Sequence, residues 1–254
     1  MEIHLESQGP HIALVTIDNP PRYNAMTREM LAELARLWDE LEKSVCRCIV
    51  IQGAGDKAFT SGADVSGDLS AEEDKARVIN RALLKTSSFR KPIIAAVNGV
   101  CAGGGVELLL STDVRIAADH ARFGLPEVKW SIYPFGGATV KLVRQIGYVH
   151  AMDLLLTGRL VDAHYAREIG LVNRVVPGAK VRDEALASAE LIARNSPSAV
   201  QAVKQQISAT LAEHALARET LDQTLGDAVR ESPHFTEGVA AFREKREPVY
   251  RDSG

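Results

Sequence analysis

Three consecutive glycines, Gly103 to Gly105, follow an apolar segment and open a predicted helix. At such a helix start the backbone N–H groups are not covered by side chains and carry partial positive charge, so they favour an anionic oxygen. That oxygen belongs either to a phosphate or to a carbonyl polarised in an oxyanion hole. Leu108 replaces the third glycine of a dinucleotide fingerprint, and no Lys-Ser/Thr pair follows as in a P-loop. The segment therefore favours carbonyl polarisation, with tight helix-on-strand packing as the structural alternative.

Two glutamates lie in apolar surroundings close to these glycines. Glu107 stands in the first turn of the same predicted helix, between Val106 and the apolar residues 108–110, and Glu127 follows the segment 123–126 with sequence FGLP. A carboxylate at a helix start is often only a surface cap. A buried carboxylate, however, needs a partner or a function. Together the two indicate a general acid/base pair next to a polarised carbonyl.

Other catalytic patterns are weaker. Ser61 has Phe59 where a Gly-x-Ser-x-Gly motif requires glycine, which argues against a serine hydrolase. Cys101 has no histidine near it in the sequence and is better explained as a small core residue than as a nucleophile. The seven histidines are scattered singly, and no Cys-x-x-Cys pair suggests zinc, so we expect no metal.

The elements that position these residues alternate between strand and helix patterns. Apolar runs predict strands at residues 3–5, 12–17, 48–52, 92–97, 114–118 and 171–176. Helical spacing or caps predict helices after Thr27, after the Ser70/Glu73 capping box, at 103–110, up to Ile146, as a pair broken at Gly158, and after Asp162. From Asn195 onward only helices are predicted, at 196–211, 215–229 and 236–245. The chain is therefore an α/β protein with a helical C-terminal quarter.

Composition sets further limits. The chain has 254 residues, 46% of them hydrophobic, and its 30 Lys+Arg against 33 Asp+Glu give a net charge of -3. These values exclude a disordered or collagenous chain, indicate one large domain with at most a small appendage, and give no basic excess for nucleic acid or lipid. Three cysteines without disulfide spacing, and a beginning unlike a secretory signal, favour the cytoplasm. The apolar segment 92–110 contains Asn98 and Glu107, so we expect no membrane span.

Taken in order, several motifs together resemble the enoyl-CoA hydratase/isomerase family, also called the crotonase family. The resemblance covers nearly the full length and rests on NPP (19–21) with NAM (24–26), AFTSGAD (58–64), AAVNG (95–99) with the triple glycine, FGLPE (123–127), LTGR (156–159) and FREKR (242–246). It implies a crotonase-like spiral of β-β-α units in residues 1–194 and a C-terminal helical region, 195–254, for trimerisation. It also implies acyl-CoA thioester chemistry in fatty acid metabolism, a trimer or a dimer of trimers, and no cofactor beyond the coenzyme A carried by the substrate.

The resemblance further implies roles for particular residues. The backbone N–H groups of Ala63 and Gly104 would hold the thioester oxygen, Glu127 would be the main proton donor, and Glu107 would orient the water. Because both glutamate positions are occupied, we expect an enoyl-CoA hydratase. The alternatives are a Δ3-Δ2 enoyl-CoA isomerase working through Glu127 alone, a thioesterase or dehydratase of this family, and a CoA- or RNA-binding member without catalysis.

Substrate contacts are assigned by the same resemblance. Plausible phosphate contacts are Arg22, Lys57 and, through a neighbouring copy, Lys245, although a solvated surface charge is an equal alternative for each. Ala25 and Ala58 belong to the matching motifs, and Asp64 is expected to brace its loop. Phe135 departs from the family pattern, which has a small residue there, and is expected to reshape the water or acyl pocket near Glu127.

Overall fold

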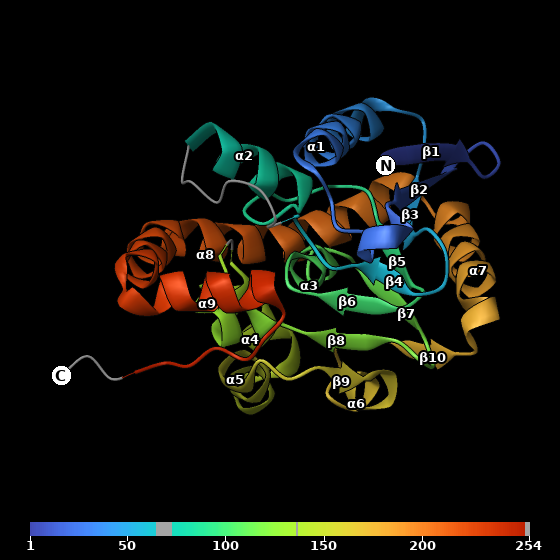
Figure 1. Ribbon diagram of the computed structural model, residues 1–254. Coiled ribbons are helices and arrows are strands. Elements are labelled where there is room, and N and C mark those ends of the chain that lie inside the picture. Colours follow the sequence, from blue (N-terminus) through green and yellow to red (C-terminus); the bar gives the residue numbers. More distant parts are fainter. Residues whose placement is uncertain (65–72, 136, 252–254) are drawn as a thin grey trace.

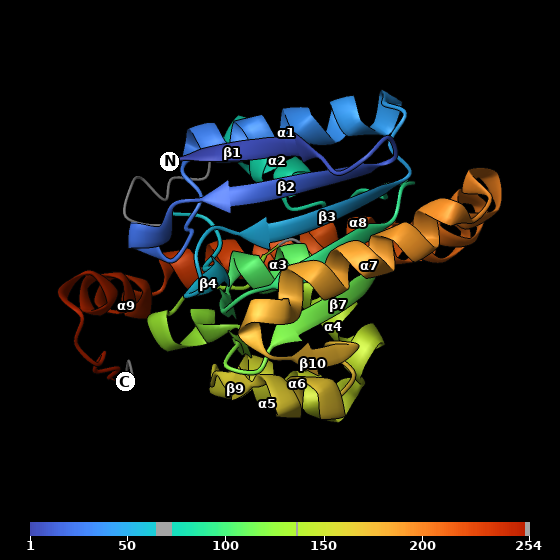
Figure 2. The same ribbon diagram turned by 90° about the vertical axis from the view of Figure 1, so that its right-hand side faces the viewer.

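The computed structural model describes residues 1–64, 73–135 and 137–251 and contains two sheets (Figures 1 and 2). The larger sheet has the strand order β1 (Glu2–Ser7), β2 (Ile12–Asp18), β3 (Cys48–Gly53), β5 (Ile93–Val97), β7 (Val114–Ala118) and β10 (Arg174–Val176). The smaller sheet has the order β4 (Ala58–Thr60), β6 (Val100–Ala102), β8 (Arg122–Gly124) and β9 (Val161–Asp162). Pairing is parallel except between β1 and β2 and between β8 and β9.

A repeated unit connects the two sheets. A strand of the larger sheet is followed by a short strand of the smaller sheet and then by a helix, as in β3–β4–α2 (Glu73–Ala82) and β5–β6–α3 (Gly104–Leu109). The third unit, β7–β8, leads into the 3-10 helix η2 (Pro126–Trp130). The expected spiral of β-β-α units is therefore confirmed. The short strands β4, β6 and β8 run parallel, so they end at the same edge of the smaller sheet.

The remaining helices pack on these sheets or on one another. They are η1 (Pro20–Arg22), α1 (Arg28–Lys43), α4 (Ala138–Ile146), α5 (Tyr148–Thr157), α6 (Ala163–Glu168), η3 (Gly178–Lys180), α7 (Val181–Arg194), α8 (Pro197–Glu231) and α9 (Pro233–Glu244). Figure 2 shows α7 across the larger sheet, and Figure 1 shows α9 folded back along the end of α8. Within the described ranges, no helix combines the length and apolar character needed to cross a membrane.

Helix α1 shows how the sequence pattern produces the core. The Thr27 side chain accepts a hydrogen bond from the Met30 N–H and caps the helix, as predicted. Its apolar face is buried, and fully burying one such side chain stabilises the fold by about 1.5–3 kcal/mol. The Trp38 indole also donates to the Ala82 carbonyl at 2.8 Å, which ties α1 to α2.

Some predictions were wrong in detail. The break expected between residues 211 and 215 does not exist, because the residues there favour helix and α8 continues for 35 residues. The strand expected from Leu171 begins only at Arg174, since the N–H groups of Leu171 and Val172 both donate to the Ala166 carbonyl at the end of α6. Helix α7 and the short strands of the smaller sheet were not predicted. The Ser70 cap lies outside the described residues.

Candidate active site

The glycine run connects β6 to α3 in a conformation that only small residues allow. Gly103 has φ 55° and its N–H donates to the Gly124 carbonyl at 3.0 Å. A Cβ on Gly103 would lie 3.2 Å from Oε1 of Glu127, so this glycine also leaves room for that carboxyl group. A Cβ on Gly105 would lie 2.1 Å from the Thr60 carbonyl oxygen. Tight packing of the helix against β4 therefore explains Gly105, while Gly103 faces the Glu127 side chain.

Two backbone N–H groups approach each other from different sheet units. A Cβ on Gly104 would lie 3.1 Å from the Gly62 Cα and 3.3 Å from the Ala63 nitrogen, so the two segments are in direct contact. Gly104 is the first residue of α3, where N–H groups have no partner inside the helix. Ala63 bridges Met26 through the Gly62 carbonyl and the Asp64 N–H. In such a bridge the Ala63 N–H points to the opposite side. The two donors together can form an oxyanion hole.

Glu107 is buried on α3, as its apolar neighbours predicted, and it has a cationic partner. Its side chain is 6% exposed, and its Oε2 lies 2.7 Å from the ammonium of Lys85, which is equally buried. A buried carboxylate needs such compensation because burial alone disfavours its charge.

Glu127 lies on η2 in a different electrostatic environment. The residue is half-buried, but its Oε2 is closed off from solvent and has no hydrogen-bond partner among the described residues. Burial, together with the nearby charge of Glu107, raises the pKa of Glu127 to about 8, against smaller opposing effects of a backbone hydrogen bond and of Lys85. A carboxyl with this pKa carries a proton at neutral pH, so it can donate one.

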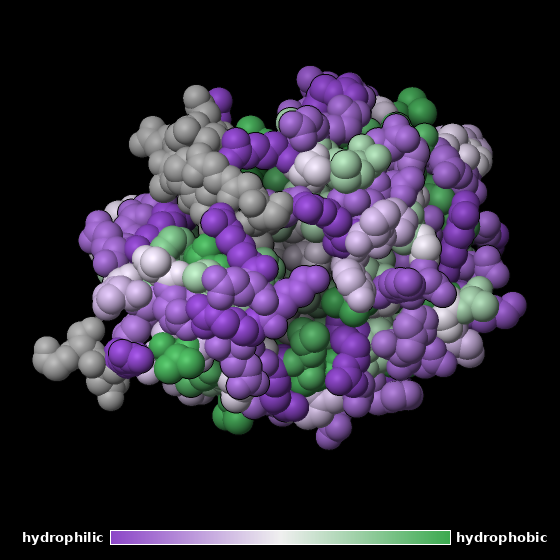
Figure 3. Space-filling model, viewed as in Figure 1, coloured by the Kyte–Doolittle hydropathy of each residue, from purple (hydrophilic) through white to green (hydrophobic). Residues whose placement is uncertain are grey.

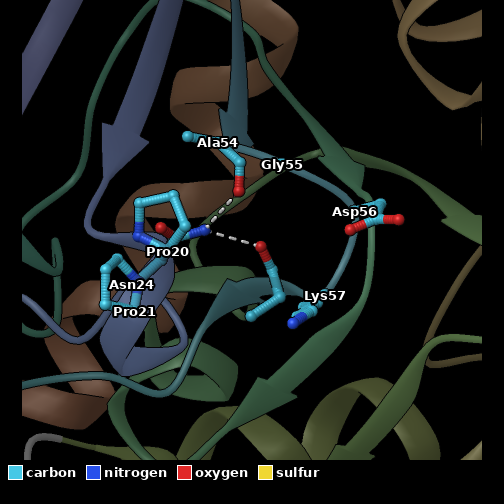
Figure 4. A pocket seen from close by; sticks show the side chains of 8 residues that line it. Pro20, Pro21, Asn24, Ala54, Gly55, Asp56 and Lys57 are labelled. Atoms are coloured by element: carbon cyan, nitrogen blue, oxygen red, sulfur yellow. Dashed lines mark hydrogen bonds between the residues drawn. The ribbon is translucent and has the colours of Figure 1, made fainter.

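A small pocket lies at the beginning of β4 (Figure 4). Its volume is about 220 Å³, and it is lined by Pro20, Pro21, Asn24, Ala54, Gly55, Asp56, Lys57 and Ala58. The Asn24 side chain fixes its shape by donating to the carbonyls of Ala54 at 3.0 Å and Ala58 at 2.7 Å. Two of the predicted substrate contacts, Lys57 and Ala58, thus come together in one pocket.

The other predicted contacts lie on neighbouring or separate elements. Arg22 of η1 forms an ion pair with Asp64, which follows β4. Ala25 is buried between η1 and α1. Lys245 ends α9 in a left-handed conformation, on an element separate from those that carry Arg22 and Lys57.

The ring of Phe135 contacts helix α8. A Cβ on Gly226 would lie 2.0 Å from the Phe135 Cζ, and the Arg230 guanidinium lies 4.4 Å from the ring centroid. Tyr133 donates to the buried Asp222 at 2.9 Å, and Trp130 stacks edge-on against Phe242 of α9. The segment after Glu127 is therefore held by the C-terminal helices.

Sequence reasoning missed Lys85 and Asp222. Lys85 lies in the polar stretch 85–88 with sequence KTSS, which indicates a surface loop. Asp222 lies on a mainly exposed helix, where a charged residue is ordinary. No local signal marks either one, because each is buried by an element distant in the sequence.

The matching family model, the related sequences and the related structures agree with one another. Residues 7–253 match the family model described as enoyl-CoA hydratase/isomerase. Enoyl-CoA hydratase EchA19 of Mycobacterium tuberculosis is 39% identical, over 98% of this chain and 96% of that protein, and 2,3-dehydroadipyl-CoA hydratase of Escherichia coli is 36% identical, over 96% and 97%. The crystal structure of carnitinyl-CoA hydratase from Mycobacterium avium superposes with a TM-score of 0.89, at 34% identity and 98% coverage of both chains.

Proposed function

This chain belongs to the enoyl-CoA hydratase/isomerase family, and we propose that it catalyses the reversible addition of water to a 2-enoyl-CoA thioester. The observation that carries the proposal is the coupling of two glutamates: the charge of Glu107 contributes to raising the pKa of Glu127 to about 8. A protonated carboxyl thus lies near a carboxylate that is paired with a cation. Adding water across a double bond needs both an acid and a base, and this pair supplies them.

In the proposed reaction the N–H groups of Ala63 and Gly104 donate to the thioester oxygen. The oxygen of water bonds to the β-carbon while Glu107 accepts one of its protons, and the electron pair of the double bond moves to form an enolate. The α-carbon of the enolate then takes the proton of Glu127. The starting state returns when a proton passes from Glu107 to Glu127 through solvent. Each step runs backward in dehydration.

The coenzyme A part of the substrate is assigned to the pocket beside β4. Lys57 supplies a cation there, and Ala58 lines the same pocket. Arg22 follows directly after its prolines, and Ala25 follows Asn24, another lining residue. Phosphate groups are bound by cations of this kind on flexible side chains. Lys245 would join them only from a neighbouring copy of the chain.

The test is loss of the enoyl thioester absorbance over a panel of acyl-CoA substrates. The panel includes acidic and hydroxylated acyl groups, because the named relatives act on dehydroadipyl and carnitinyl thioesters. We expect Glu127→Gln and Glu107→Gln each to lower kcat/KM at least about tenfold. Glu231→Gln, an exposed carboxylate at the end of α8, is the control that keeps the wild-type rate.

Three outcomes would contradict hydration. The first is isomerisation of a 3-enoyl thioester that survives Glu107→Gln, in a protein that adds no water to any 2-enoyl thioester; it would identify an isomerase. The second is release of free coenzyme A, detected with a thiol reagent, which would identify a thioesterase. The third is tight coenzyme A binding without turnover, which would identify a binding protein.

We also propose that the chain assembles into a trimer or a dimer of trimers. Helix α8 leaves large apolar side chains exposed, and Figure 3 shows hydrophobic patches on the side of α8 and α9. These residues are Val203, Ile207, Leu216, Leu221 and Leu225. An apolar groove of about 790 Å³ runs along the first half of α8. Such surfaces are typical of interfaces between subunits, and sedimentation analysis would give the number of copies.

We place the protein in the cytoplasm on the basis of its cysteines. Cys46, Cys48 and Cys101 are all free thiols. Burial raises the pKa of Cys48 to about 12, so this thiol stays protonated and unreactive. Free thiols of this kind are typical of a reducing compartment.

A further inference from the structure

Lys85 is a buried cation in direct contact with Glu107, and the reaction described above gives it no role. Its ammonium lies 2.7 Å from the Glu107 Oε2, and both side chains are only 6% exposed. We propose that Lys85 is a positioning residue, which supplies the counter-charge of Glu107 and holds its carboxylate in the orientation that accepts the proton of water. This role rests on the hydration chemistry of the preceding subsection.

The backbone conformation around Lys85 is fixed by several hydrogen bonds. Leu84 has φ 51°, a left-handed conformation that is unfavourable for a residue with a Cβ. The Lys85 N–H donates to the Asn80 carbonyl at 2.9 Å, which closes the end of α2. The Leu84 carbonyl is held by Lys141 Nζ at 2.7 Å and Ser111 Oγ at 3.0 Å. An unfavourable conformation kept in place by its surroundings is typical of functional sites.

The other charges that act on Glu107 do not replace Lys85. Lys141, from α4, donates to neutral oxygens. Burial, opposed by Glu107 and assisted by Lys85 and Arg115, lowers the pKa of Lys141 to about 8. Lys141 is therefore only partly charged near that pH. Glu127, from η2, repels the charge of Glu107 when it ionises. Among the residues that the structure describes, Lys85 is the cation that forms an ion pair with the Glu107 carboxylate.

Loss of Lys85 should change the pH dependence of the reaction. An opposite charge at close range shifts the ionisation of a carboxyl by about 1–3 pH units. Without the ammonium, the Glu107 carboxylate loses this buried ion pair, and the lowering effect of Lys85 on the pKa of Glu127 is lost as well. We therefore expect Lys85→Met to lower kcat/KM for hydration and to shift its pH profile by about one unit or more.

The experiment compares pH profiles of the full-length protein with Lys85 replaced by Met and by Arg. Lys85→Arg keeps the charge and should retain most of the wild-type profile. Lys91→Met is the matched control, because Lys91 is another buried lysine whose ammonium donates to the backbone carbonyls of Leu41 and Ser44. It should keep the wild-type pH profile even if the melting temperature falls.

A double variant separates positioning from a structural role. Lys85→Met should lower kcat/KM at pH 6 about tenfold in the wild-type protein but less than about twofold in a Glu107→Gln background, because its effect passes through Glu107. Glu107→Gln/Lys85→Met also removes both charges of the pair, so it remains measurable if Lys85→Met alone fails to fold. Equal losses in both backgrounds, or an unchanged pH profile in folded Lys85→Met, would overturn the role of Lys85 alone. A wild-type protein that hydrates no enoyl thioester would overturn the proposed function as well.

Discussion

The ring of Phe135 lies against the backbone of Gly226 so closely that a Cβ there would come within 2.0 Å of the Phe135 Cζ. This contact joins the segment that follows Glu127 to the C-terminal helix of the same chain. Tyr133 reinforces it by donating to Asp222, whose other carboxylate oxygen accepts from the Gly137 N–H. The C-terminal helices therefore support the acid of the proposed reaction in addition to exposing an apolar surface.

Adding one methyl group at Gly226 should disturb this support. Gly226→Ala forces the Phe135 ring out of its position, and overpacking of this kind costs about 1–3 kcal/mol. Because the displaced segment leads back to Glu127, we also expect kcat for hydration to fall severalfold. Urea unfolding and initial rates measure the two effects.

Two further variants test whether the contact between Phe135 and the added methyl group causes these losses. Thr224→Ala, at an exposed position of α8, should change stability by no more than about 0.5 kcal/mol. Phe135→Ala combined with Gly226→Ala should be less destabilised than the two single losses together, because the smaller side chain gives room to the new methyl group. Strictly additive losses would argue against a direct clash.

Tyr133→Phe tests the hydrogen bond beside the ring. The change removes the donor to Asp222 and leaves a buried carboxylate with less compensation. We expect a loss of about 1–3 kcal/mol in the free energy of unfolding. Asp222→Asn/Tyr133→Phe should recover part of this loss, because it removes the charge as well. A Tyr133→Phe variant as stable as the wild type would show that the bond contributes nothing.

The residues of the glycine run and Glu107 were predictable because their signals are local. The apolar residues around Glu107 wrap the helix nearly completely, so its burial follows from the sequence. The approach of Ala63 to Gly104 was predicted from family resemblance alone. It depends on β4 and β6, which have three residues each and are too short for an alternating pattern to be visible.

The support of the two glutamates was not predictable for another reason. The buried Lys85 follows Leu84, which adopts a left-handed conformation, and a leucine gives no sign of this in a sequence. The contact of Phe135 with Gly226 joins residues 91 positions apart, and its sequence signal is a single glycine within a helix. Such contacts depend on how whole helices and strands pack together, and a local sequence pattern carries no information about that packing.

The stability of the protein should depend on pH through Glu127. In the folded chain, burial and the charge of Glu107 raise its pKa from 4.5 to about 8. Between these values the folded state binds more protons than the unfolded state, so this group makes stability fall as pH rises through that window. Glu127→Gln removes this effect. The free energy of unfolding of the variant, relative to that of the wild type, should therefore increase between pH 4.5 and about 8, by at most about 1.4 kcal/mol per pH unit.

Urea unfolding of both proteins at pH 5, 7 and 9 measures this difference. In a Glu107→Gln background the second cause is absent, so the trend should end at a lower pH. A stability difference that stays constant across the range would mean that Glu127 ionises equally in the folded and unfolded chains.

The glycine run offers a comparison between two adjacent positions. Gly104→Ala places a methyl group 3.3 Å from the Ala63 nitrogen and 3.1 Å from the Gly62 Cα, which forces the two N–H donors slightly apart. Because loss of one oxyanion donor costs about 10²–10³ in rate, we expect this smaller displacement to lower kcat about tenfold or more, with little change in the melting temperature. Gly105→Ala instead meets the Thr60 carbonyl at 2.1 Å, so it should unfold the protein more easily. If Gly104→Ala kept the wild-type kcat while remaining folded, Ala63 and Gly104 would not be the donors to the thioester oxygen.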